Sequence, residues 1–278
     1  MNTQDSEQII AEHDPALYRP ERSAQVVPGP SSIDSAAVTF YREHGYMAVA
    51  GVLNEAEVAE SIAHVEWLAR HADTDGDYAR TQREATAKNE AGSDAVRKLW
   101  FDRGQVEQSG MPVHHPTVLD IVSRLMNGQG PVIFQTMALL KPPRIGREKP
   151  WHQDHAYFDI PLEDRIVGVW IALDEATIDN GCMQLIDAGH LDGPMHHWKR
   201  RDWQICDTDM MGRQSVAAQL KPGAALFFDS LLPHGTPSNR SSKRRRAMQF
   251  HYAPANAASW TTEQRMEVFG TEGKDVYC

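Results

Sequence analysis

Two histidines and one aspartate in this sequence have the types and the spacing that suit a single metal ion. His152 and Asp154 form a His-x-Asp triplet just before an apolar run at 166–173, and His234 follows a second apolar run at 224–228. In an extended chain, residues two apart point to the same face, so this imidazole and carboxylate can reach the same ion.

Two histidines and one carboxylate on one face of a metal leave three coordination positions open, which is typical of non-haem Fe(II) oxygenases. The open positions can take a bidentate 2-oxo acid and then O2. A chain with 13 histidines can contain one such triplet by chance, so the hypothesis needs further residues that match a co-substrate.

Such residues follow His234 in the chain. Arg245 opens a strand-like run in which Arg245, Ala247, Gln249 and His251 would share one face. A guanidinium inside a β core is costly unless a carboxylate pairs with it. The distal carboxylate of 2-oxoglutarate would supply that partner, and the hydroxyl of Thr236 could bind the same group.

The elements that must position these residues fall into two parts. Apolar spacing and capping residues predict helices over 31–45, 54–68 and 116–127, with a first strand over 46–53. After Gly130, short runs rich in β-branched and aromatic residues predict an antiparallel β core. These runs are 132–140, 166–173, 183–186, 216–220, 224–228 and 247–252.

The pattern predicts one oxygenase domain over 31–278, preceded by a mobile N-terminal arm at 1–30 that ends in Val-Pro-Gly-Pro. Within the domain we expect a helical part at about 31–128 and a β core at about 131–256. We expect a surface loop at 72–96 and an insertion loop at about 191–215.

The chain resembles the phytanoyl-CoA dioxygenase family of Fe(II)/2-oxoglutarate-dependent oxygenases, from Phe40 to Ala253. The resemblance is densest in motifs that surround the proposed metal ligands. They are MALLKPP at 137–143, WHQDHAYF at 151–158, GVWIALD at 168–174, NGCM at 180–183, PGAALFF at 222–228, HGT at 234–236 and RRA at 245–247.

The resemblance implies a mainly β fold with flanking helices, around a double-stranded β-helix (jelly-roll, cupin-like) core. It implies Fe(II) bound by His152, Asp154 and His234, with 2-oxoglutarate and O2 as co-substrates. The residues that it assigns to 2-oxoglutarate are Arg245, Thr236, Trp170, Met137 and Lys98.

Related halogenases replace the metal-binding carboxylate by a small residue, so Asp154 favours a hydroxylase, or another oxidation such as desaturation or ring formation. Tyr157, Phe158 and Trp203 are candidates for the pocket of the main substrate, a small organic molecule that the sequence does not identify. The expected reaction converts 2-oxoglutarate to succinate and CO2 while the substrate is oxidised.

Two other readings remain open. A cupin-like binding protein or isomerase could hold Zn or Ni with His152 and His234, but it gives Arg245 no role. A non-catalytic family member could act as a sensor, although it would not need all three ligands together with Arg245.

Composition and sequence patterns argue against several other classes of protein. The net charge of −10 argues against a nucleic-acid partner. The N-terminus lacks a signal-peptide pattern, no run is long and apolar enough to span a membrane, and the three cysteines show no disulfide framework or CxxC zinc motif. We therefore expect a cytoplasmic enzyme.

Overall fold

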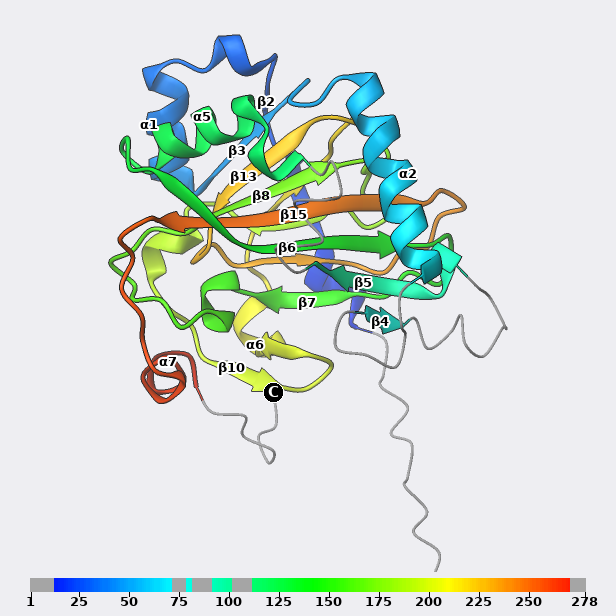
Figure 1. The fold of residues 1–278 in the computed structure, drawn as a ribbon. Helices are drawn as coiled ribbons and strands as arrows, with labels where there is room; N and C mark the ends of the chain where they lie inside the picture. Colours follow the sequence, from blue (N-terminus) through cyan, green and yellow to red (C-terminus); the bar gives the residue numbers. More distant parts are fainter. Residues whose placement is uncertain (1–12, 72–78, 82–91, 102–111, 271–278) are drawn as a thin grey trace, which may run out of the picture.

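The computed structural model describes residues 13–71, 79–81, 92–101 and 112–270, and its strands form two main β-sheets that share a core (Figure 1). The larger sheet runs in the order β2 (Val26–Val27), β3 (Tyr46–Val49), β13 (Ala225–Asp229), β8 (Val167–Ala172), β15 (Arg245–Pro254), β6 (Pro131–Lys141), β5 (Val96–Trp100) and β4 (Ala79–Thr81). The smaller sheet runs β1 (Pro20–Ser23), β12 (Ser215–Ala218), β9 (Met183–Ile186), β14 (His234–Thr236) and β7 (Lys149–His152).

Successive side chains along each strand point to opposite faces, and both faces of the larger sheet are apolar. On β8, Trp170 and Ala172 point into the core between the sheets, where they join Leu185 of the smaller sheet. Val169 and Ile171 point the other way, into a core beneath the helices. Strands buried on both faces are typically near-continuous apolar runs, and β8 is fully buried along its length.

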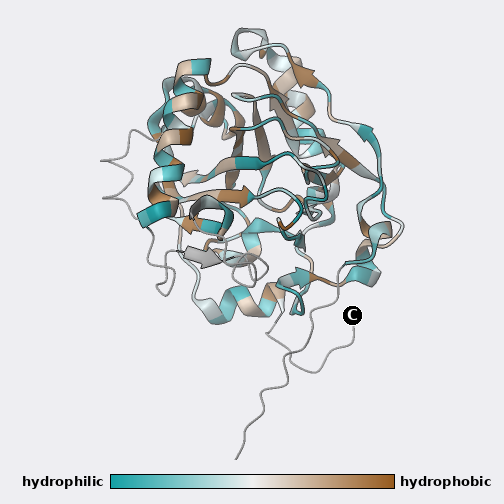
Figure 2. Cartoon of the chain, turned by 90° about the vertical axis from the view of Figure 1, so that its right-hand side faces the viewer, coloured by the Kyte–Doolittle hydropathy of each residue, from teal (hydrophilic) through white to brown (hydrophobic). Residues whose placement is uncertain are grey.

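Helices α1 (Ser35–His44), α2 (Glu55–His71) and α5 (Pro116–Leu125) cover that outer face, and each carries hydrophobic and hydrophilic residues (Figures 1 and 2). The side chain of Asp34 caps the start of α1 by accepting a hydrogen bond from the Ala37 amide. Gly45 ends α1 in the left-handed region, at φ 79°, as its sequence position predicts.

The N-terminal segment differs from its prediction as a mobile arm at 1–30. From His13 onward it belongs to the fold: β1 pairs in parallel with β12, and β2 pairs in parallel with β3. The ring of Tyr18 stacks on Trp151 at 5.4 Å, and the Trp151 indole donates to the Leu17 carbonyl. Strand pairing and aromatic packing therefore fix a segment whose local composition favours disorder. Residues 1–12 lie outside the described residues.

The predicted insertion loop at 191–215 also contains regular structure. Strands β10 (His197–Lys199) and β11 (Trp203–Ile205) form a hairpin, which the short helix α6 (Asp207–Met210) follows. The loop predicted at 72–96 lies partly outside the described residues, and β4 lies within its bounds. The last described helix is α7 (Thr262–Phe269), which a capping box at Thr261 and Gln264 begins. None of the helices in the described ranges is long and apolar enough to cross a membrane.

Candidate metal and co-substrate site

The His-x-Asp triplet and the distant histidine meet at one end of a cavity. His152 ends β7, Asp154 begins the following short helix, and His234 begins β14. Strands β7 and β14 pair with His152 directly opposite His234. One ligand atom from each of the three residues lies within 4.8 Å of the others, and all three residues are buried. Among the described residues, no other group of three or more His, Cys, Asp or Glu side chains lies close enough together to hold a metal ion.

Backbone carbonyls fix both imidazoles. The Nδ1 atom of His152 lies 2.8 Å from the Pro150 carbonyl, and that of His234 lies 2.9 Å from the Leu232 carbonyl. Because a carbonyl can only accept, each Nδ1 carries the proton and each Nε2 presents a lone pair. These Nε2 atoms lie 3.2 Å and 3.6 Å from the carboxylate oxygens of Asp154.

Burial sets the ionisation of the same residues. It lowers the pKa of His152 to about 3 and also lowers the pKa of His234, so both imidazoles are neutral near pH 7. Burial alone would raise the pKa of Asp154, but His234 and His251 outweigh it and hold that pKa well below its usual range. Two neutral imidazoles and an ionised carboxylate are the forms that bind a divalent metal.

Two further residues hold the Asp154 carboxylate. The Gln249 amide donates to its Oδ2 atom at 2.9 Å, and His251 Nε2 lies 2.8 Å from the same oxygen. Both residues lie on β15, on the face that also carries Arg245, as the alternation predicts. Neither residue was predicted to contact Asp154, because no local sequence pattern indicates that this face of β15 meets it.

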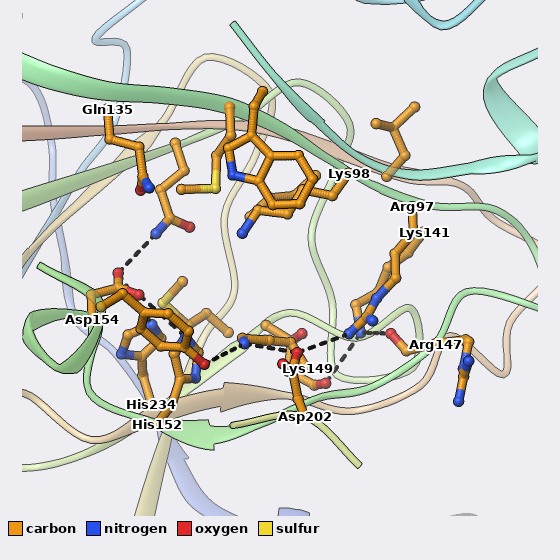
Figure 3. Close-up of a pocket in the computed structure, with 18 of the residues that line it drawn as sticks. Arg97, Lys98, Gln135, Lys141, Arg147, Lys149, His152, Asp154, Asp202 and His234 are labelled. Carbon is orange, nitrogen blue, oxygen red and sulfur yellow. Dashed lines mark hydrogen bonds and ion pairs between the residues drawn. The ribbon is translucent and has the colours of Figure 1, made fainter. Parts of the chain in front are cut away.

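The cavity has a volume of about 440 Å³, and the metal-binding group lies at one end of it (Figure 3). Most of the site residues expected from the sequence line its wall. They are His152, Asp154, His234, Arg245, Thr236, Met137, Lys98, Tyr157 and Phe158.

Two predicted site residues do not line the cavity. Trp170 lies behind Arg245, whose guanidinium carbon is 5.4 Å from the indole centroid. Trp203 packs edge-on against Tyr157 at 5.1 Å, and its carbonyl accepts a hydrogen bond from the Tyr157 hydroxyl. Each tryptophan therefore supports a residue of the wall without belonging to the wall.

Arg245 is the most unusual charge in the cavity wall. It is 2% exposed, and burial lowers its pKa to about 10. Its Nε and Nη1 atoms have no hydrogen-bond partner among the described residues. Leaving a buried N–H of a charged group unpaired costs several kcal/mol, on the order of 1–3 per group or more. The arrangement fits an anion that binds in the cavity.

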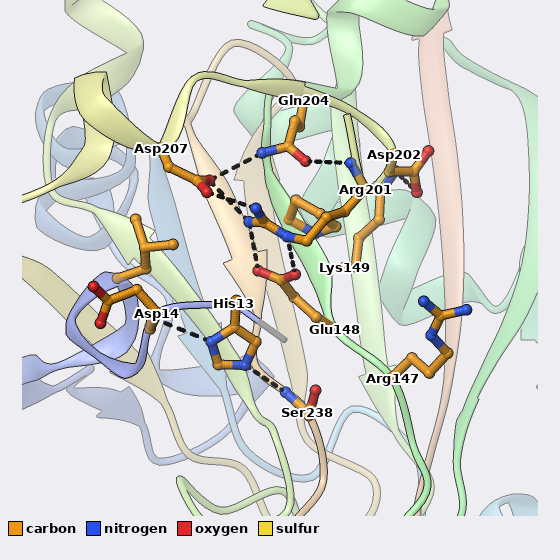
Figure 4. A network of polar contacts seen from close by, with 12 residues as sticks. His13, Asp14, Arg147, Glu148, Lys149, Arg201, Asp202, Gln204, Asp207 and Ser238 are labelled. Atoms are coloured by element: carbon orange, nitrogen blue, oxygen red, sulfur yellow. Dashed lines mark hydrogen bonds and ion pairs between the residues drawn. The ribbon is translucent and has the colours of Figure 1, made fainter. Parts of the chain in front are cut away.

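A polar network joins the β10–β11 hairpin to the strand that carries His152 (Figure 4). Arg201 donates to Glu148 at 2.7 Å and to Asp207 at 2.5 Å. The residues that follow Glu148 and Arg201 in the sequence, Lys149 and Asp202, form a second salt bridge at 2.8 Å. These two neighbouring bridges hold the hairpin against the cavity.

Comparison with known proteins agrees with this site. The profile of the family described as phytanoyl-CoA dioxygenase (PhyH) matches residues 41–247. The chain therefore belongs to the phytanoyl-CoA dioxygenase family of Fe(II)/2-oxoglutarate-dependent oxygenases, as the motifs predicted.

Individual proteins are also similar to this chain. Phytanoyl-CoA dioxygenase domain-containing protein 1 of Danio rerio is 27% identical over 83% of this chain and 93% of its own length. Several other curated relatives match over about half of their length.

Solved structures give the same fold. EvdO2 from Micromonospora carbonacea var. aurantiaca, complexed with 2-oxoglutarate, has a TM-score of 0.62 and 26% identity, covering 86% of this chain and 98% of its own. The non-heme alpha ketoglutarate dependent carbocyclase SnoK from nogalamycin biosynthesis has a TM-score of 0.66 and 21% identity, covering 89% and 97%. The predicted fold class, a mainly β protein with a double-stranded β-helix core, is confirmed.

Proposed function

We propose that the chain is an Fe(II)/2-oxoglutarate-dependent oxygenase that hydroxylates a small organic molecule. The observation that carries the proposal is the pairing, in one cavity, of a buried His–Asp–His group with a buried arginine that lacks an acceptor among the described residues. The first can hold a divalent metal, and the second can hold the far end of a dicarboxylate.

For the metal, we propose His152, Asp154 and His234 as ligands. Both imidazoles present their Nε2 lone pairs toward Asp154, and the carboxylate is ionised. Three protein ligands leave positions for a chelating 2-oxo acid and O2. When bound, Fe(II) would supply the oxidative chemistry that converts 2-oxoglutarate and O2 to succinate and CO2 while one oxygen atom enters the substrate.

For 2-oxoglutarate, we propose that Arg245 and Thr236 bind the distal carboxylate. A guanidinium can match a carboxylate through two parallel hydrogen bonds. Arg245 has buried donors, Nε and Nη1, that lack partners among the described residues and are available to such an anion. Met137 lines the same cavity and would limit the space beside the co-substrate. Trp170 would keep the guanidinium in place from behind.

The retained carboxylate at Asp154 supports hydroxylation over halogenation, because no position is left open for a halide in its place. Tyr157 and Phe158 line the cavity beside the metal-binding group and would face the substrate. EvdO2 was solved with 2-oxoglutarate, and SnoK is a carbocyclase, so products of ring formation belong in the analysis alongside hydroxylated ones.

The test is anaerobic reconstitution with Fe(II), followed by addition of 2-oxoglutarate and then O2. We expect Fe(II) and 2-oxoglutarate to bind together and labelled 2-oxoglutarate to yield CO2, faster when a substrate is present. Reconstitution with Zn(II) should support binding but no CO2 release. Tight Zn(II) or Ni(II) binding with no affinity for 2-oxoglutarate would instead favour the cupin-like binding protein.

A further inference from the structure

Strand β6 carries one residue that has no partner on β15, and this residue is Phe134. The two strands pair antiparallel, with Gln135 opposite His251 and Ile133 opposite Tyr252, so Phe134 is the extra residue of a β-bulge. A bulge turns a side chain out of the regular alternation of its strand, and bulges are common beside active sites. The side chain of Phe134 is therefore aimed by the register of two strands.

The bulge turns Phe134 toward the side of the sheet that carries the metal-binding group. Ile133 takes the place on the opposite face, where it packs against the core beneath the helices. The ring of Phe134 instead lies edge-on to that of Phe158 at 4.8 Å, and 6.1 Å from the ring of His251. Phe158 lines the cavity and His251 holds Asp154, so Phe134 extends the cavity wall beside the metal-binding group.

The residues around Phe134 make this part of the wall apolar and open. Val132 lies opposite Ala253, and Ala253 packs with Phe158. Phe134 is 40% exposed and Val132 is 50% exposed. Exposed apolar side chains that lie together, rather than singly, mark interaction and ligand-binding surfaces. These four residues, Val132, Phe134, Phe158 and Ala253, form an apolar shelf at the edge of the cavity.

The apolar shelf and Arg245 lie on opposite sides of the metal-binding group. Along β15 the order is Arg245, then Gln249 and His251, which hold Asp154, and then Ala253 of the shelf. Under the proposed function, 2-oxoglutarate extends from the metal toward Arg245. The co-substrate therefore lies on one side of the metal, and the apolar shelf lies on the other.

Figure 3 shows the same arrangement from inside the cavity. Gln135, the neighbour of Phe134 in the chain, lies with Asp154 at one end, while Lys141 and Arg147 lie at the other. The shelf end of the cavity thus presents aromatic and aliphatic side chains to a ligand. A polar group placed against them would lose its water without gaining a hydrogen-bond partner.

We propose that the main substrate carries an apolar group, a ring or an alkyl chain, that packs on the apolar shelf. This inference rests on the proposed function and names the class of molecule that the site oxidises. Phe134 and Phe158 contact the apolar group, and its position on them decides which carbon of the substrate faces the metal-binding group. Phe134 is then a residue that determines specificity.

The experiment measures, by calorimetry, the binding of neutral probes to full-length protein loaded anaerobically with Fe(II) and saturated with 2-oxoglutarate. The probes are cyclohexylmethanol and heptanol, which separate a ring from a chain, with glucose and sorbitol as their polar counterparts. The variants are Phe134→Gln, which makes the position polar, and Phe134→Leu, which keeps it apolar. The matched control is Trp67→Gln, which removes an exposed aromatic side chain of α2.

We expect at least one apolar alcohol to bind about tenfold more tightly than its polar counterpart, since burial of roughly 50–60 Å² of apolar surface is sufficient for that ratio. Phe134→Gln should remove most of this preference, whereas Phe134→Leu and Trp67→Gln should retain it. The affinity for 2-oxoglutarate, followed by its visible charge-transfer band on Fe(II), should stay unchanged in all three variants.

A second measurement locates the probe. With Mn(II) in place of Fe(II), the NMR relaxation of the probe protons should be faster than with Zn(II), which is not paramagnetic. This difference should shrink in Phe134→Gln at the same probe concentration. Sedimentation velocity of the wild type and of Phe134→Gln tests whether a second copy of the chain covers the shelf instead.

The inference would be overturned by a wild type without preference for the apolar probes, by a preference that survives in Phe134→Gln, or by an equal loss in Phe134→Leu. Equal relaxation with Mn(II) and Zn(II) would also overturn it. A loss of 2-oxoglutarate affinity in Phe134→Gln would assign the shelf to the co-substrate, and a dimer that this variant dissociates would assign it to an interface.

The proposed function and the role of the shelf fail in different ways. A wild-type protein that does not bind 2-oxoglutarate would contradict the proposed function itself. One that binds 2-oxoglutarate but does not prefer the apolar probes would contradict only the role of the apolar shelf.

Discussion

The Nε2 atom of His251 lies 2.8 Å from Oδ2 of Asp154, while Nδ1 of His251 is buried without a partner in the described part of the chain. The carboxylate is ionised and can only accept, so Nε2 of this imidazole carries a proton and donates it. Phe158 and Phe228 pack around the ring at 4.9 Å and 6.3 Å and hold it in place. His251 is therefore a donor that fixes the rotation of Asp154.

Replacing this donor should weaken metal binding. We predict that His251→Phe lowers Fe(II) affinity by about tenfold or more, since removing a hydrogen-bond partner of a metal ligand typically costs 10–100-fold. Anaerobic Fe(II) titration measures the effect, and the exposed His196→Phe serves as the control. Unchanged affinity in a folded His251→Phe protein would show that Gln249 alone is sufficient to orient Asp154.

Arg245 should govern the affinity for 2-oxoglutarate. Removing one partner of a buried charge pair costs about 2–5 kcal/mol, so Arg245→Met should raise the KM for 2-oxoglutarate by about 30-fold or more. Arg213→Met, which removes a surface pair with Asp192, is the matched control. If KM for 2-oxoglutarate is the same in Arg245→Met and in the control, the distal carboxylate binds elsewhere.

Fe(II) should stabilise the protein through His234. A ligand at about 100 times its Kd adds about 2.7 kcal/mol to the free energy of unfolding, which corresponds to several degrees in Tm. We predict this increase for the wild type under anaerobic conditions and its absence in His234→Ala. The control, His114→Ala, alters an exposed histidine and should respond to Fe(II) as the wild type does. A chelator should reverse the increase, and an Fe(II)-dependent rise in His234→Ala would exclude that residue as a ligand.

His197 should make stability depend on pH. Its Nε2 accepts from the Gln153 amide and its Nδ1 lies 2.8 Å from the Met195 carbonyl, so the folded state needs the neutral ring. Burial lowers its pKa from 6.5 to about 3. Between these values the unfolded chain binds more protons than the folded one, so the free energy of unfolding falls as the pH falls.

For one group, this loss amounts to up to about 2 kcal/mol between pH 6.5 and 5. Urea unfolding at both pH values measures it, and His197→Gln, which does not titrate, should show a smaller difference. An equal pH dependence in the two proteins would assign the effect to other groups.

Sequence patterns predicted those parts of the site that depend on which side chains share one face of a strand. His152 and Asp154 are close in the chain, and Arg245, Gln249 and His251 follow one strand face. The contact between that face and Asp154 depends on how β15 passes over the metal-binding group, which no local pattern encodes. The same holds for Tyr18, whose segment is fixed by parallel pairing with a strand almost 200 residues away. Trp170 matches the family pattern and Trp203 was predicted to line the substrate pocket, but each packs against a residue that faces the cavity.

The two bridges Arg201–Glu148 and Lys149–Asp202 have a consequence for redesign. Glu148 and Lys149 belong to the segment that leads to His152, while their partners belong to the β10–β11 hairpin. A hairpin transplanted from a relative would leave Glu148 and the Lys149 ammonium without their charged partners, a few residues before the proposed metal ligand His152. Exchange of substrate preference between relatives should therefore succeed only when residues 148–149 and 197–207 are moved as one module.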